Sequence, residues 1–180
     1  MKNYELKNQS QLEHCHPGLT GCSHHYRKCH HPQLLLQPVM RTITLIILHC
    51  SGTPEGKSLS FEACKQDHIE HRGFKDIGYH YYVERDGTLF EGRPLDQVGA
   101  HCVSHNRHSI GICYEGGLDE YGESADTRTE AQRDTLLDLL IRLKQQFPNA
   151  LIFGHNEFDR SKPCPSFEAE EYRAIFAMNH

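Results

Sequence analysis

The sequence predicts an α/β fold, a single domain with a central mixed β-sheet flanked by helices. Three observations indicate it. Residues 42–48 form a β-branched, apolar run that is typical of a buried central strand. Residues 79–93 have the pattern of a β-hairpin, and residues 129–147 have the apolar periodicity of an amphipathic helix. Because strands and helices are interleaved along the chain, helices packed on a mixed sheet are expected.

The first predicted strand is followed by a helix and then by the hairpin. Ser60 is a favourable N-cap for a helix that runs to about Arg72 and stops at Gly73. The hairpin then follows, with strands over 79–85 and 88–93 joined by an Asp-Gly turn.

The second half of the chain adds two strands and two helices. A strand is expected over 109–114, before a Gly-Gly pair, and a short strand over 151–154. Thr129 and Gln132 have the spacing of a capping box, which opens the clearest helix. A closing helix is expected over 167–176. The apolar face of the capped helix consists of Leu136, Leu139, Leu140, Leu143 and Phe147.

Residues 1–39 differ from residues 40–180, and we expect the fold to be confined to the second segment. The first segment holds three of the eight cysteines and six of the fifteen histidines but no sustained apolar pattern. One interpretation is an accessory metal-binding tail, since His and Cys ligate zinc and copper. The other is a disordered leader, or upstream sequence translated ahead of a true start at Met40. The second is favoured because no metal-finger spacing occurs.

Composition limits the class of protein. A length of 180 residues fits one domain with a real core. The longest apolar run, residues 43–48, is too short to span a bilayer, and the first residues lack the apolar core of a signal peptide. We therefore expect synthesis in the cytoplasm and no membrane partner. The net charge of −5 argues against nucleic acid as a partner.

Three separated residues are candidates for a catalytic zinc site, which needs three protein ligands and one open position. His49 ends the first predicted strand, His155 ends the last, and Cys164 lies in a proline-restricted loop. Two alternatives stay open on spacing alone. Each histidine can be a structural strand-end residue, or Cys164 and His155 can form a nucleophile pair. Cys50 is a poorer ligand candidate, because strand alternation points it away from His49.

Five sequence blocks resemble the amidase-2 family, which includes the T7-type phage lysozymes and the peptidoglycan recognition proteins. The resemblance covers about residues 42–167 and is closest to the T7-type branch. The blocks occur in the family's order: ILHCSGT (47–53), IGYHYYVERDGTLFEGRP (77–94), VGAH (98–101), NRHSIGICYEGG (106–117) and GHNEF…KPCPSF (154–167).

This resemblance implies one Zn²⁺ held by His49, His155 and Cys164. Peptidoglycan-binding receptors of the family that do not hydrolyse their ligand typically lack the cysteine. Its presence at position 164 therefore implies a catalyst.

Four further roles are implied by the same resemblance. Tyr79 matches the tyrosine beside the metal, and Lys162 matches the lysine that supports the transition state. His101 and Asn106 match positions near the substrate groove. Without the resemblance, Lys162 would be read as a solvated charge, Tyr79 as a half-buried strand aromatic, and the other two as structural residues.

The implied function is a zinc-dependent N-acetylmuramoyl-L-alanine amidase. It would hydrolyse the amide between the lactyl group and L-alanine in bacterial peptidoglycan. We expect a monomer that acts as an endolysin on the cell wall after release, or on cytoplasmic muropeptides. The alternatives are a non-catalytic muropeptide-binding protein and a protein-interaction role, for which no residue argues.

Overall fold

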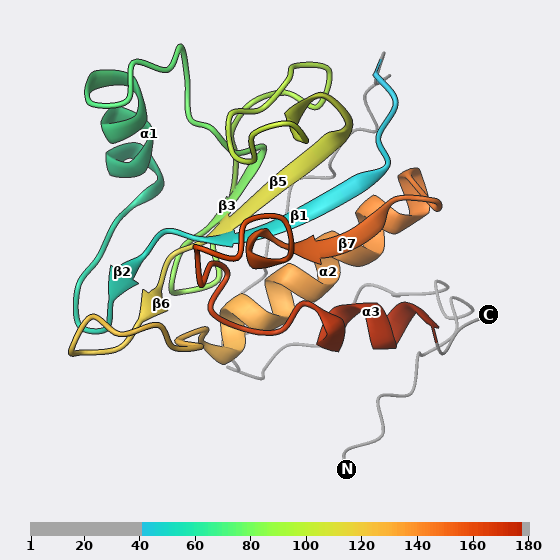
Figure 1. Cartoon of the computed structure of the whole chain (residues 1–180). Coiled ribbons are helices and arrows are strands. Elements are labelled where there is room, and N and C mark those ends of the chain that lie inside the picture. The colour runs from blue at the N-terminus through green and yellow to red at the C-terminus, as the bar shows by residue number, and fades with distance from the viewer. Residues whose placement is uncertain (1–40, 178–180) are drawn as a thin grey trace, which may run out of the picture. The chain divides into compact units, whose positions relative to one another are not determined.

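The computed structural model describes residues 41–177. Within this range one five-stranded sheet forms the centre of the fold (Figure 1). In spatial order its strands are β4 (Leu89–Glu91), β3 (Tyr81–Val83), β5 (Ser109–Tyr114), β1 (Leu45–Cys50) and β7 (Leu151–Gly154). All neighbouring pairs are parallel except the antiparallel β3–β4 pair. The predicted mixed sheet is therefore confirmed.

One face of the sheet carries helix α1 (Phe61–Glu70). Tyr82 and Cys113 on this face pack in a buried cluster with Phe61 and Cys64 of that helix. His49 is paired in register with Cys113 on the neighbouring strand. Since paired residues of adjacent strands point to the same side, the His49 side chain also lies on the α1 face.

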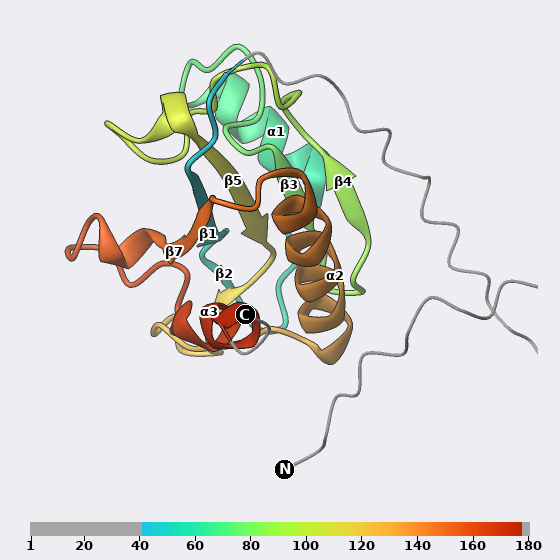
Figure 2. The ribbon, with the colours of Figure 1, turned by 90° about the vertical axis from the view of Figure 1, so that its right-hand side faces the viewer.

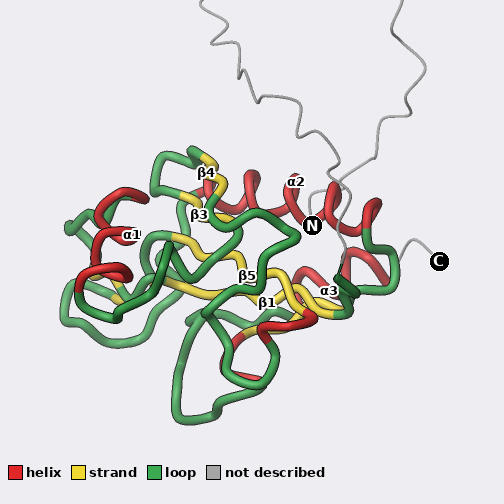
Figure 3. Tube along the Cα trace, turned by 90° about the horizontal axis from the view of Figure 1, so that it is seen from above, coloured by secondary structure: helices red, strands yellow, loops and turns green. Residues whose placement is uncertain are grey.

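The opposite face carries helix α2 (Glu130–Gln146). Strand alternation points Tyr81 to this face, where it lies close enough to Arg142 of α2 for their charges to interact. Figure 2 shows α2 running alongside β3, and Figure 3 shows loops crossing the side of the strands away from α2. Helix α3 (Glu170–Ala177) contacts β7. The loops therefore lie over the α1 face of the sheet, and this is the face on which they can form a site.

The starts of α1 and α2 follow the sequence closely. Ser60 is the N-cap of α1, and its hydroxyl accepts from the N–H of Ala63. Thr129 and Gln132 form the predicted capping box of α2. Of the residues predicted to form the apolar face of α2, Phe147 is the C-cap of the helix. The others are buried: Leu136, Leu139, Leu140 and Leu143.

Several predicted boundaries were wrong. β1 begins at Leu45 rather than Thr42, and α3 begins at Glu170 rather than Phe167. The ring of Phe167 instead lies 3.3 Å below the guanidinium of Arg128. The hairpin strands are shorter than expected. Although the Tyr79 carbonyl still accepts from the N–H of Arg93 at 3.0 Å, the regular ladder starts at Tyr81.

Four short elements were not predicted, because two or three residues carry no periodic signal. They are β2 (Thr53–Pro54), which pairs with β6 (Gly117–Leu118), and the 3₁₀ turns η1 (Asn106–His108) and η2 (His155–Glu157).

Residues 1–39, predicted to be a separate leader, lie outside the described residues, so that division stays a prediction. Among residues 41–177, none of the helices combines the length and the apolar character that crossing a bilayer requires.

Candidate metal centre

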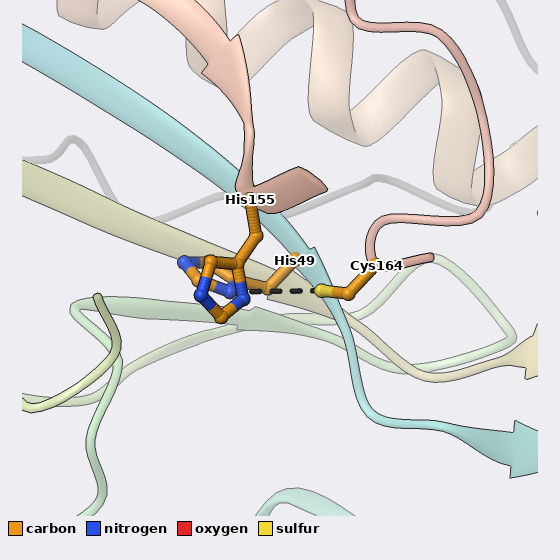
Figure 4. A group of neighbouring side chains, drawn as sticks. All are labelled: His49, His155 and Cys164. Atoms are coloured by element: carbon orange, nitrogen blue, oxygen red, sulfur yellow. Dashed lines mark hydrogen bonds between the residues drawn. The ribbon is translucent and has the colours of Figure 1, made fainter. Parts of the chain in front are cut away.

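Two histidines meet because parallel neighbouring strands end at the same edge of the sheet. The β1–β7 register pairs Leu48 with Gly154. The next residues, His49 and His155, therefore lie side by side, with ring centroids 4.6 Å apart. Cys164 approaches them from the loop before α3 (Figure 4).

The donor atoms of the three residues are close enough to share one ion. Taken one from each of His49, His155 and Cys164, they all lie within 4.8 Å of one another. The sulfur of Cys164 is 3.7 Å from Nδ1 of His49. Two donors bound to zinc through nitrogen and sulfur at a tetrahedral angle are roughly 3.6 Å apart. The two-nitrogen, one-sulfur set therefore fits zinc in spacing and in chemistry.

Backbone hydrogen bonds position the Cys164 sulfur. The N–H of Cys50 donates to it at 3.2 Å, and the N–H of Asn156 donates to the Cys164 carbonyl at 2.7 Å. The adjacent Cys50 thiol and burial together raise the pKa of the Cys164 thiol. A thiolate at this position thus needs a nearby positive charge, which a bound metal ion supplies.

The His49 imidazole is held neutral, as a metal ligand must be. Burial lowers its pKa well below the usual value, and the neighbouring imidazoles and Lys162 add to the shift. Its second nitrogen, Nε2, lies 3.1 Å from Nδ1 of His101. Burial also lowers the pKa of His155, with Lys162 contributing.

Tyr79 lies beside the ligand group. Its ring centroid is 5.3 Å from that of His49, and the ring also packs against the α1 cluster. Burial raises the pKa of the Tyr79 hydroxyl well above its ordinary value, with Cys113 and Cys164 contributing. The phenol therefore keeps its proton and is suited to donate a hydrogen bond.

The ammonium of Lys162 is paired with a carboxylate rather than directed at the ligands. It lies 3.5 Å from Asp159, and the two side chains are 55% and 39% exposed. Pairs this exposed contribute little to stability, because solvent screens the attraction. Little free energy is needed to turn the ammonium towards a bound substrate.

His101 and Asn106, both predicted to contact substrate, are engaged with the protein. The side-chain oxygen of Asn106 accepts from the N–H groups of His101 and Cys102, each at 2.9 Å. His101 contacts His49, as described above. Sequence reasoning missed Ser109, whose hydroxyl lies 3.3 Å from Nε2 of His101. Gly111, a glycine inside a buried strand, indicates close approach, and it lies beneath the His101 ring.

A family model described as N-acetylmuramoyl-L-alanine amidase, Amidase_2, matches residues 39–167, which is more than half of the chain. The chain belongs to the amidase-2 family.

Individual members agree with this assignment. The amidase is 36% identical over 127 residues to the endolysin of Escherichia phage T7, covering 71% of this chain and 83% of that protein. It matches the structure of the amidase LysC from Clostridium intestinale at 28% identity and a TM-score of 0.63, covering 76% and 87% of the two chains. Drosophila PGRP-LB, at 22% identity and a TM-score of 0.61 over 79% and 84%, shares the fold.

Family and relatives together identify the activity as that of an N-acetylmuramoyl-L-alanine amidase. The non-catalytic alternative is thereby disfavoured. The nucleophile-pair alternative is disfavoured by the geometry, since the Cys164 sulfur shares its surroundings with two imidazoles rather than one.

Proposed function

We propose that the amidase holds one zinc ion between His49, His155 and Cys164 and hydrolyses the lactyl–L-alanine amide of peptidoglycan. The observation that carries the proposal is the meeting of three donor atoms within 4.8 Å at one sheet edge. Zinc supplies polarisation of the scissile carbonyl and an activated water when it is bound.

Two side chains act on the charge that develops during hydrolysis. A thiolate ligand leaves the metal less electrophilic than three neutral imidazoles would, so further donors are needed. The protonated Tyr79 hydroxyl donates to the developing oxyanion or orients the attacking water. Lys162 supplies a positive charge once it leaves Asp159. A substrate contact by His101 or Asn106 remains a further prediction.

The biological role follows from the relatives. Phage endolysins are among the most similar proteins, which favours wall degradation after release over the recycling of muropeptides. We propose that the amidase works as a monomer, is made in the cytoplasm, and has peptidoglycan as its partner rather than nucleic acid or a membrane.

The test is product analysis with metal control. The zinc-loaded full chain should release peptides with a free L-alanine N-terminus from purified peptidoglycan, as measured by mass spectrometry, and chelation should stop the release. Cys164→Ala should lose hydrolysis and most zinc binding. Cys64→Ala, at a buried cysteine on α1, is the matched control and should keep both. Full hydrolysis by Cys164→Ala would contradict the assignment of Cys164 as a zinc ligand.

A further inference from the structure

The ring of His101 sits in a space that two glycines leave open. A Cβ atom added at Gly111 of β5 would lie 2.5 Å from the ring, and one added at Gly99 would also lie 2.5 Å from it. Contacts this short do not occur between real side chains. The absence of a side chain at both positions therefore allows the imidazole to lie directly against the sheet, beside His49.

Both nitrogens of this ring have partners. Nδ1 of His101 lies 3.1 Å from Nε2 of His49, and Nε2 of His101 lies 3.3 Å from the hydroxyl of Ser109. The loop that carries the ring is fixed at its backbone, where Asn106 accepts from two successive N–H groups. A continuous path of hydrogen bonds thus leads from the sheet to the metal-facing histidine.

The direction of this path follows from which nitrogen faces the sulfur. Nδ1 of His49 is the nitrogen 3.7 Å from Cys164, so it is the one that must be unprotonated to ligate. A neutral imidazole then carries its proton on Nε2. That N–H donates to Nδ1 of His101, whose own proton is then on Nε2 and donates to Ser109.

We infer that His101 is a positioning residue for His49, and that Asn106 holds it in place. The ring accepts the Nε2 proton of His49, and so selects the tautomer and the ring orientation that present Nδ1 to the metal. Partners of this kind change metal affinity when they are removed. The inference rests on the proposed zinc site, and it gives His101 a role other than substrate contact.

Two substitutions separate ring volume from hydrogen bonding. His101→Phe keeps a ring between the glycines but removes the acceptor. His101→Asn keeps a polar atom near the position of Nδ1. We expect His101→Phe to weaken zinc binding about 10- to 100-fold in competition with a chelator, and His101→Asn to recover part of that loss. The fall in activity should appear in kcat, with KM for a muropeptide changed less than about twofold.

His68→Phe is the control for loss of a buried histidine. His68 accepts from the N–H of Gly78 and packs on Phe74, so its removal should lower stability without changing zinc affinity. In the zinc-loaded wild type, proton–nitrogen NMR should place the His49 proton on Nε2. That measurement needs no variant and stands even if a variant fails to fold.

The outcomes are distinguishable. Unchanged zinc affinity in a folded His101→Phe, or a raised KM with normal kcat and zinc binding, would overturn the positioning role and favour substrate contact. A His49 proton on Nδ1 in the loaded wild type would also overturn it. If the wild type binds no zinc at all, the proposed function itself has failed rather than this inference alone.

Discussion

Lys162 and Asp159 form an ion pair 3.5 Å long on the exposed side of the loop that delivers Cys164. The two residues are three positions apart in sequence. The pair joins the cation that we implicate in the chemistry, Lys162, to a carboxylate that takes no part in the chemistry. Its exposure means that it contributes little to the stability of the fold. We therefore treat it as a resting position of the ammonium.

Lys162→Ala should separate catalysis from metal binding. Loss of a charge that stabilises the oxyanion is expected to lower kcat roughly 10²- to 10³-fold, while zinc stays bound. Asp159→Asn, which frees the ammonium, should leave stability in urea almost unchanged and should not lower kcat. Steady-state hydrolysis with parallel zinc titration measures both. Normal turnover in Lys162→Ala would contradict the assigned role.

Tyr79→Phe tests the hydroxyl alone, because the ring and its packing against His49 are kept. We expect zinc affinity within about twofold of the wild type and a loss of kcat on the order of 10²-fold. Because burial raises the pKa of this phenol, activity should show no titration of Tyr79 up to its ordinary pKa of about 10. An unchanged kcat in this variant would show that the hydroxyl takes no part.

Arg128, which directly precedes the N-cap of α2, joins that end of α2 to α3. Its side chain is fully buried, pairs with Asp126 and Glu171, and stacks on Phe167. Arg128→Ala should lower the free energy of unfolding by roughly 2–4 kcal/mol, through lost charged hydrogen bonds and the lost cation–π contact. Arg133→Ala, at a side chain 42% exposed, should cost less than about 1 kcal/mol. Urea denaturation compares them, and equal costs would count against this reading.

The buried imidazoles predict how stability depends on pH in the metal-free protein. Burial lowers the pKa of each one, and that of His80 to about 4. In the unfolded chain the pKa is about 6.5, so the unfolded state binds more protons below that value. The stability that these neutral imidazoles contribute is therefore fully present above about pH 6.5, and it is lost as pH falls towards 4. The residues concerned are His49, His68, His80, His101 and His155.

Urea denaturation between pH 7.5 and 5.5 measures this loss above the range in which most carboxylates titrate. Each histidine contributes at most about 1.4 kcal/mol per pH unit. His80→Gln should give a shallower dependence than the wild type. A free energy of unfolding that is constant or rises towards pH 5.5 would be inconsistent with neutral buried imidazoles.

Local signals in the sequence were enough to predict the main elements. The capping box of α2, the Ser60 cap of α1 and the buried β1 run depend on neighbouring residues, and the structure has all three. The ligand residues could be proposed because strand ends are rigid positions and because the family resemblance selected among the many histidines. Spacing alone left the alternatives open.

The remainder depends on contacts between residues far apart in sequence. Nothing near His101 indicates that its ring lies beside His49, because the two are 52 residues apart and meet only when the loop before β5 folds against the sheet. The Cys50 N–H that donates to Cys164 is 114 residues away from it. Boundaries failed for a related reason. The Tyr79 carbonyl keeps one strand-like hydrogen bond, from the N–H of Arg93, while the regular ladder does not reach it.

X-ray absorption spectroscopy at the zinc edge of the zinc-loaded full chain tests most directly whether two imidazoles and one thiolate hold a single zinc ion. We predict one sulfur at about 2.3 Å and two imidazole nitrogens at about 2.0 Å in the first coordination shell, with one lighter ligand completing it. A first shell made only of nitrogen and oxygen would contradict the account.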